Sequence, residues 1–201
     1  MNQFISAVTR LDASSVKGFL GSGYRWKNWS ESTGKNALHY VAAVPVGDDL
    51  EKQKDGLAIL KILLKNGLDM NSVHRIEDKN CGYFPATPLW YSYAKGRNPL
   101  IYKHLLKQGA NPDNCWWAMS WFDDAAAGDL WLRQGAKIEQ PTLDEVFVGS
   151  IGWRRYKFAE WLLKRGADVN AVDAKGRTTM MVAAKRRDKD AIKMLASYGA
   201  T

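Results

Sequence analysis

The sequence lacks the residues that usually hold a metal or cross-link a small chain. It has only two cysteines, Cys81 and Cys115, and neither belongs to a CxxC motif or to a cluster with histidine. The three histidines, His39, His74 and His104, are scattered along the chain. Zinc sites need cysteine and histidine at close, regular spacing, so no metal site is expected. Both thiols are expected to be free, as is usual in a reducing compartment.

Long apolar runs are also missing. No stretch approaches the roughly 18 uninterrupted apolar residues of a membrane-crossing helix. The first residues, MNQFISAVTRLDASS, lack the basic head and apolar run of a signal peptide. Apolar residues nevertheless make up 46% of the 201 residues, which is enough for a core and excludes a disordered chain. We therefore expect a folded cytoplasmic protein with no membrane partner.

The motifs of common catalytic sites do not occur. The sequence contains no GxSxG, no P-loop, no HExxH and no other glycine-rich phosphate-binding loop. Asp123 and Asp124 are adjacent carboxylates in an expected helix, where neighbouring residues point in different directions. They are therefore not expected to share a metal ion. The sequence predicts a protein that is not an enzyme and needs no cofactor.

Positive charge is concentrated near one end of the sequence. The chain has 29 Lys and Arg residues against 21 Asp and Glu residues, a net charge of +8. Residues 152–201 contribute 12 of the basic residues and 5 of the acidic ones, a net charge of +7. Residues 113–145 are acidic instead. Uneven charge bears on the choice of partner rather than on the fold.

Two short phrases recur along the chain. The first is an apolar pair, two mostly polar residues and a glycine, as in LLKRG (162–166), and it is typical of a helix end. The second is a helix start, seen as NALHYVA (36–42), TPLWYSY (87–93) and TTMMVAA (178–184). The glycines that close the first phrase are Gly67, Gly109, Gly135, Gly166 and Gly199.

Together the two phrases resemble the ankyrin repeat, a unit of about 33 residues with a β-turn, two antiparallel helices and a TPLHxA signature. The match is best over residues 173–199 (DAKGRTTMMVAAKRRDKDAIKMLASYG), while TPLW (87–90) and GKNALH (34–39) keep part of the signature. The resemblance implies an all-α repeat solenoid, an ankyrin array of stacked helix–turn–helix units with short β-turn or hairpin fingers. It also implies that His39, at the signature histidine, supports its turn by hydrogen bonding.

The register of the phrases predicts a single ankyrin-repeat domain over residues 1–201. Asp12 is expected to cap the second helix of an N-terminal cap, and segment 72–86 to form an extended hairpin finger with His74 in a solvated loop. The predicted parts are the N-terminal cap (1–24), repeat 1 with an inserted loop at 44–55 (25–71), repeat 2 (72–113), a degenerate repeat 3 (114–139), repeat 4 (140–170) and the C-terminal repeat (171–201).

The resemblance further implies where a partner binds, because first helices and turn tips form a concave face in ankyrin arrays. Most of the nine tryptophans are expected in the core, including Trp131 and Trp161, but the register points Trp121 and Phe122 outward, as in a binding hot spot. The alternative is an irregular repeat 3 that buries both rings. The predicted protein-binding residues are Trp121, Phe122, Asp123, Asp124, Lys95, Lys35, Lys175, Arg177, Lys185 and Arg186.

The predicted function is therefore a non-catalytic protein–protein interaction module, monomeric when alone. A dedicated inhibitor, an immunity-type protein or an adaptor would fit this description. Two alternatives stay open. The run KRRDK (185–189) could contact nucleic acid, although Asp188 interrupts it and the acidic middle would repel a long duplex. Repeat 3 could instead be a surface for self-association.

Overall fold

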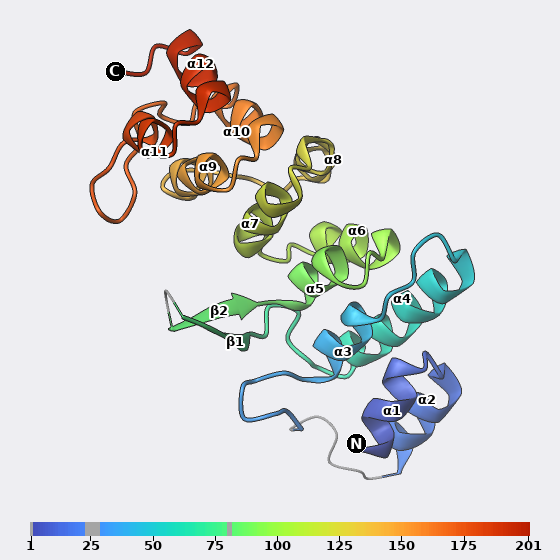
Figure 1. The fold of residues 1–201 in the computed structure, drawn as a ribbon. Helices are drawn as coiled ribbons and strands as arrows, with labels where there is room; N and C mark the ends of the chain where they lie inside the picture. Colours follow the sequence, from blue (N-terminus) through green and yellow to red (C-terminus); the bar gives the residue numbers. More distant parts are fainter. Residues whose placement is uncertain (1, 23–28, 80–81) are drawn as a thin grey trace. The chain divides into compact units, whose positions relative to one another are not determined.

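The computed structural model describes residues 2–22, 29–79 and 82–201. The chain divides into two compact units, Met1–Asn114 and Cys115–Thr201. The division falls where the predicted repeat 2 gives way to the degenerate repeat 3. An array of repeats can divide in this way because each repeat packs only on its neighbours. Figure 1 labels the elements of both units.

The described residues of the first unit form three helix pairs and one hairpin. The predicted cap at Asp12 is confirmed, because its carboxylate accepts a hydrogen bond from the Ser15 amide (2.9 Å) at the start of α2. Buried side chains such as Phe4, Leu38 and Leu60 form its core. The helices are α1 (Gln3–Thr9), α2 (Ala13–Gly21), α3 (Ala37–Ala43), α4 (Leu50–Lys65), α5 (Pro88–Ala94) and α6 (Pro99–Lys107).

The insertion in repeat 1 is mostly helix. The prediction of an inserted loop at 44–55 is wrong over residues 50–55, which form the first turns of α4, a helix of 16 residues. Asp49 caps this helix by accepting a hydrogen bond from the Lys52 amide (3.1 Å), and the Gln53 side chain donates to the Gly47 carbonyl (2.7 Å). These local bonds favour extra helical turns over a longer loop.

The predicted finger is an antiparallel hairpin of β1 (His74–Asp78) and β2 (Gly82–Ala86). Its first residue corrects a prediction, because His74 is not in a solvated loop. The imidazole is half-buried, with Nδ1 at 2.7 Å from the Tyr91 hydroxyl and its ring stacked on that tyrosine. The hydrogen-bond partner of His74 is Tyr91, which lies 17 positions further along the chain, so the local sequence does not reveal it.

The second unit contains three helix pairs whose core is built around tryptophan. Trp116 and Trp131 are fully buried, and Trp161 is 5% exposed and stacks on Trp116 at 6.0 Å between ring centroids. The helices are α7 (Asp113–Phe122), α8 (Ala125–Arg133), α9 (Thr142–Gly152), α10 (Tyr156–Leu163), α11 (Thr179–Lys185) and α12 (Lys189–Ser197). The degenerate repeat 3 forms two helices, α7 and α8, which contribute Trp116 and Trp131 to this core.

Two kinds of turn repeat along both units. All five predicted helix-ending glycines have positive φ, from 82° to 93°, as a left-handed helix end requires. Between the two helices of a pair, a residue other than glycine often takes this conformation. These residues are Leu11, Arg97, Asp123, Arg154 and Arg187. Asp123 and Asp124 thus lie in the α7–α8 turn, which corrects their predicted place within a helix. In the described part of the chain, no helix has the length and apolar character needed to cross a membrane.

Candidate protein-binding site

The predicted binding residues are divided between the two units. Lys35 and Lys95 belong to the first, where each lies near aromatic rings of its own unit. The Lys35 ammonium is 4.2 Å from the centre of the Tyr40 ring, and that of Lys95 is 5.9 Å from the centre of the Trp90 ring. The other eight predicted residues belong to the second unit.

In the second unit, three exposed aromatic side chains gather where α7 and α9 end. We call Trp121, Phe122 and Trp153 the aromatic patch. Their exposed fractions are 52%, 43% and 39%. The Trp153 ring packs edge-on against Trp121, with centroids 5.3 Å apart, and against the half-buried Trp117 at 5.8 Å. The structure therefore favours the outward orientation of Trp121 and Phe122 over the buried alternative.

Sequence reasoning missed Trp153, although a signal for it exists. Phe122, Trp153 and Arg186 each immediately precede the left-handed residue of the turn in three successive helix pairs. Aligning the repeats on this turn, rather than on the helix starts, places Trp153 beside Phe122.

The patch rests on close packing between α7 and α9. The hydroxyls of Ser120 and Ser150 are both buried and lie 2.7 Å apart. Trp117 lies directly over Gly149, where a Cβ atom would be only 2.5 Å from the Cζ3 atom of the ring. A small residue at position 149 therefore determines how the Trp117 and Trp153 rings are held.

Replacing Gly149 with alanine tests this packing. The added methyl group must displace the Trp117 ring, and overpacking of this kind costs about 2 kcal/mol. We expect a lower urea midpoint and a changed tryptophan fluorescence spectrum. The control is Gly152→Ala, since no atom lies within 4 Å of a Cβ at position 152. Equal stability of the two variants would show that Trp117 does not need Gly149.

Arg155 adds a cation to the aromatic patch. Its guanidinium lies 5.4 Å from the centre of the Trp121 ring, and its Nε is buried without a hydrogen-bond partner. Within the part of the chain that the structure describes, no carboxylate forms an ion pair with Arg155. A half-buried cation without a counter-ion is suited to receive an anionic group.

The two carboxylates beside the patch are used by the turn itself. Asp123 accepts a hydrogen bond from the Phe158 amide (2.8 Å), and Asp124 caps α8 by accepting one from the Ala127 amide (2.9 Å). The structure thus places these two predicted binding residues in the α7–α8 turn, where they hold α8 and α10.

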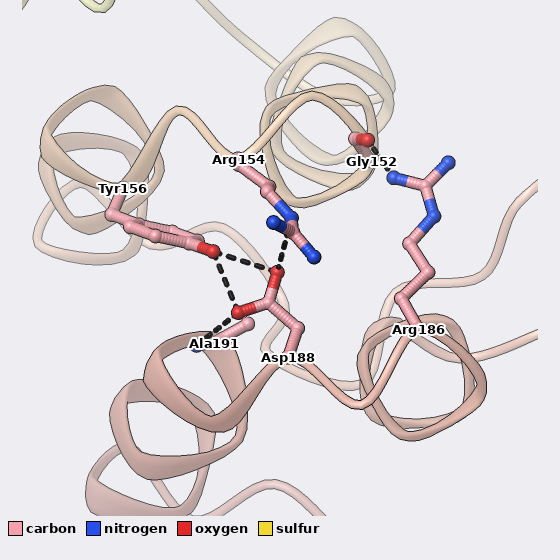
Figure 2. A network of polar contacts seen from close by, with 6 residues as sticks. All are labelled: Gly152, Arg154, Tyr156, Arg186, Asp188 and Ala191. Atoms are coloured by element: carbon pink, nitrogen blue, oxygen red, sulfur yellow. Dashed lines mark hydrogen bonds and ion pairs between the residues drawn. The ribbon is translucent and has the colours of Figure 1, made fainter.

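A buried carboxylate joins the α9–α10 and α11–α12 turns, as Figure 2 shows. Asp188, only 5% exposed, accepts hydrogen bonds from the Tyr156 hydroxyl (2.6 Å to each oxygen) and the Ala191 amide (3.2 Å). Arg154 pairs with the same carboxylate at 3.2 Å. Arg186 reaches across from α11 and donates to the Gly152 carbonyl. The predicted residue Arg186 is thereby brought next to Trp153.

The hydrogen bonds of this network shift the pKa of both central groups. Burial raises the pKa of the Asp188 carboxyl, but the bonds from Tyr156 and Ala191 and the charge of Arg154 outweigh it and lower the pKa overall. Burial and the hydrogen bond to Asp188 raise the pKa of Tyr156 to about 12. Asp188 is thus a structural anion, whereas the sequence suggested only an interruption of a basic run.

Lys175 and Arg177 lie in the turn that precedes α11. Arg177 is engaged locally, because its Nε donates to the Asp173 carboxylate at 2.8 Å. This bond, with those from the Arg177 and Lys175 amides, lowers the pKa of Asp173 to about 2. Of the predicted residues in this unit, the structure brings Trp121 and Arg186 to the same turn, at Trp153 and Gly152, and Phe122 and Lys185 are their neighbours in sequence.

The paired helices, glycine-ended turns and hairpin finger define an ankyrin-type repeat array. The family model for ankyrin repeats (many copies) matches residues 148–196, and structures of ankyrin repeat domains match the whole chain. The predicted resemblance is confirmed: the chain has the ankyrin-repeat fold, and residues 148–196 are ankyrin repeats. Ankyrin repeats are in general protein–protein interaction modules.

Three solved structures illustrate the similarity in fold. The human ASB11 ankyrin repeat domain is 19% identical, with a TM-score of 0.65 over 100% of this chain and 85% of that one. An ankyrin repeat domain from Acinetobacter baumannii AYE is 19% identical, with a TM-score of 0.64 over 99% and 98%. The ankyrin repeat protein EF0377 is 22% identical, with a TM-score of 0.66 over 98% and 97%. No curated protein sequence matches the chain significantly.

Proposed function

We propose that the chain is a non-catalytic protein-binding module whose contact surface is centred on the aromatic patch. The observation that carries this proposal is the clustering of exposed rings. In the described residues, nine large hydrophobic side chains are exposed, and the only tryptophans and phenylalanine among them are Trp121, Phe122 and Trp153. Contiguous exposed aromatic surface is typical of protein interfaces and of their hot spots.

The patch is also prearranged for binding. Trp153 and Arg155 hold Trp121 from two directions, and Trp117 is seated on Gly149 beneath them. Rings that are already fixed lose little conformational entropy when a partner covers them. An inhibitor, an immunity-type protein or an adaptor would each use such a surface, since each acts by occupying its partner. A cytoplasmic location and a monomeric state stay predictions.

The double substitution Trp121→Ala with Phe122→Ala tests this function. We expect it to weaken binding to the partner about 30-fold, because truncating hot-spot residues costs about 2 kcal/mol or more. The partner is first captured from a nuclease-treated native extract and identified by mass spectrometry, and its affinity for purified chains is then measured by calorimetry. Tyr198→Ala, an exposed ring on α12, is the control and should bind normally.

Two results would contradict the proposal. Unchanged affinity of the double variant would remove the aromatic patch from the interface. If material is captured from untreated extract and lost after nuclease treatment, the partner is a nucleic acid. The exposed Lys185, Arg186 and Arg187 support this alternative. Light scattering of the purified chain tests for self-association. A dimer that the double substitution abolishes would show that the partner is a second copy of the chain.

A further inference from the structure

We propose that the aromatic patch recognises an acidic segment of its protein partner, in which a carboxylate pairs with Arg155 and an apolar side chain packs on Trp121 and Trp153. This inference rests on the proposed function and names the chemistry of the partner. It follows from the cations that border the rings and from the hydrogen bonds that the nearby carboxylates already accept within the fold.

The border of the patch is positive, and its carboxylates are already occupied. Trp153 is followed directly by Arg154 and Arg155, and the Arg186 side chain ends at the Gly152 carbonyl. Asp188 is buried in the network of Figure 2, while Asp123 and Asp124 accept hydrogen bonds from backbone amides. The cations are exposed or half-buried, so the surface presents positive charge toward a partner. We call Arg154, Arg155, Lys185, Arg186 and Arg187 the basic edge.

Arg155 is the cation that most needs a partner. Its Nε is buried without an acceptor, and its guanidinium lies 5.4 Å from the centre of the Trp121 ring. A carboxylate brought by another protein would supply the missing counter-charge, and guanidinium–carboxylate pairs are strong and directional. The same approach would place an adjacent apolar side chain over the exposed Trp121 and Trp153 rings.

Arg187 adds an exposed cation to the basic edge. Arg187 has a φ of 53°, a left-handed conformation that favours glycine. Its side chain is exposed and takes part in no ion pair within the described residues. Arg154 has the same conformation in the preceding pair, with a φ of 60°, although it also pairs with Asp188. Leu11, Arg97 and Asp123 take the same conformation in the corresponding turns, so the backbone belongs to the repeat, and what distinguishes Arg187 is its exposed charge.

The geometry favours an acidic protein segment over a nucleic acid. The Trp121 and Trp153 rings are nearly perpendicular, at 80°, and Arg155 lies over Trp121, so no pair of parallel rings is open to sandwich a base. A short acidic segment needs only one or two carboxylates directed at the basic edge.

The test is selection from an unbiased library of short phage-displayed peptides against the full chain at physiological salt. Clones that also bind the Trp121→Ala, Phe122→Ala variant are discarded. We expect the remaining clones to carry net negative charge and at least one aromatic or large aliphatic residue. The best of them, synthesised with a fluorescent label, should bind the Arg155→Gln variant about tenfold more weakly and the Lys193→Gln control normally.

The Arg187→Gly variant distinguishes an effect on peptide binding from an effect on stability. Glycine relieves the left-handed backbone, so this variant should melt at the same temperature as the parent chain or higher, while binding the labelled peptide about threefold more weakly. A purely structural arginine would change stability and leave the peptide affinity unaltered. A parallel titration with a labelled oligothymidylate measures the affinity of the chain for single-stranded nucleic acid.

Each result has a distinct meaning. Neutral or basic selected clones would overturn the acidic-segment inference and leave the protein-binding function intact. The same holds if acidic clones bind Arg155→Gln and Arg187→Gly as well as the parent chain. If no clone depends on Trp121 and Phe122, both proposals fail. Binding of the oligothymidylate tighter than that of the best peptide would make the patch a nucleic-acid site.

Discussion

Replacing Asp188 with alanine is expected to lower the free energy of unfolding of the Cys115–Thr201 unit by about 3 kcal/mol. The carboxylate caps α12 at the Ala191 amide and accepts a short hydrogen bond from the Tyr156 hydroxyl, which lies 2.6 Å from each of its oxygens. A lost helix cap costs about 1 kcal/mol, and hydrogen bonds to a charged group contribute about 1.5–3 kcal/mol. The Arg154 side chain is 61% exposed, so it returns to solvent at little cost when its partner is removed.

The matched control for this change is Asp190→Ala, two residues further along α12. Asp190 is exposed, so its removal should change stability by no more than about 0.5 kcal/mol. Tyr156→Phe keeps the carboxylate and removes one donor to a charged group, and it should cost at least about 1.5 kcal/mol. Urea unfolding gives the three values, and hydrogen exchange should show the loss in α11 and α12. Equal stability of the Asp188 and Asp190 variants would mean that the buried network does not join the two turns.

Local features of this fold could be predicted because the residues that determine each of them lie within one repeat. The five helix-ending glycines, the cap at Asp12 and the hairpin at 74–86 each depend on residues a few positions apart. The inserted segment was less predictable, since its polar residues suit an exposed loop or an exposed helix equally. The cap at Asp49 and the bond from Gln53 to Gly47 favour the helix.

Contacts between repeats were the ones that the sequence did not reveal. The hydrogen bonds from Tyr156 to Asp188 and from Trp161 to Asp129 each join residues 32 positions apart, and the Trp121–Trp153 contact has the same spacing. This spacing is about one ankyrin unit. Composition and helix periodicity do not show which side chains meet across it. The exposed pair Trp121 and Phe122 could be predicted from the register, whereas Trp153, Arg155 and the buried state of Asp188 could not.

Acidification is expected to destabilise the first unit selectively between pH 6.5 and 4. His39 is fully buried, and its Nδ1 accepts a hydrogen bond from the Asn36 amide (3.1 Å). The proton is then on Nε2, which donates to the Ser72 carbonyl (3.1 Å). Burial lowers the pKa of His39 from 6.5 to about 4, against the opposing effect of the Ser72 bond.

The sign of this effect follows from proton binding. Between pH 4 and 6.5 the unfolded chain protonates His39 and the folded chain does not, so the free energy of unfolding falls as the pH falls. The full stabilisation is present above pH 6.5, and about 3 kcal/mol of it is lost by pH 4. The pKa values of His74 and His104 are also lowered by burial, so both act in the same direction.

The second unit provides an internal control, because all three histidines of the chain precede residue 115. Hydrogen exchange of the full chain, corrected for the intrinsic pH dependence of exchange, should show protection falling in α3 and α5 while α9 and α10 stay protected. His39→Gln should be less stable at neutral pH but lose less stability on acidification than the parent chain. If that variant kept the full pH dependence, His39 would not be the buried group that titrates, and the linkage would have to come from His74 and its bond to Tyr91.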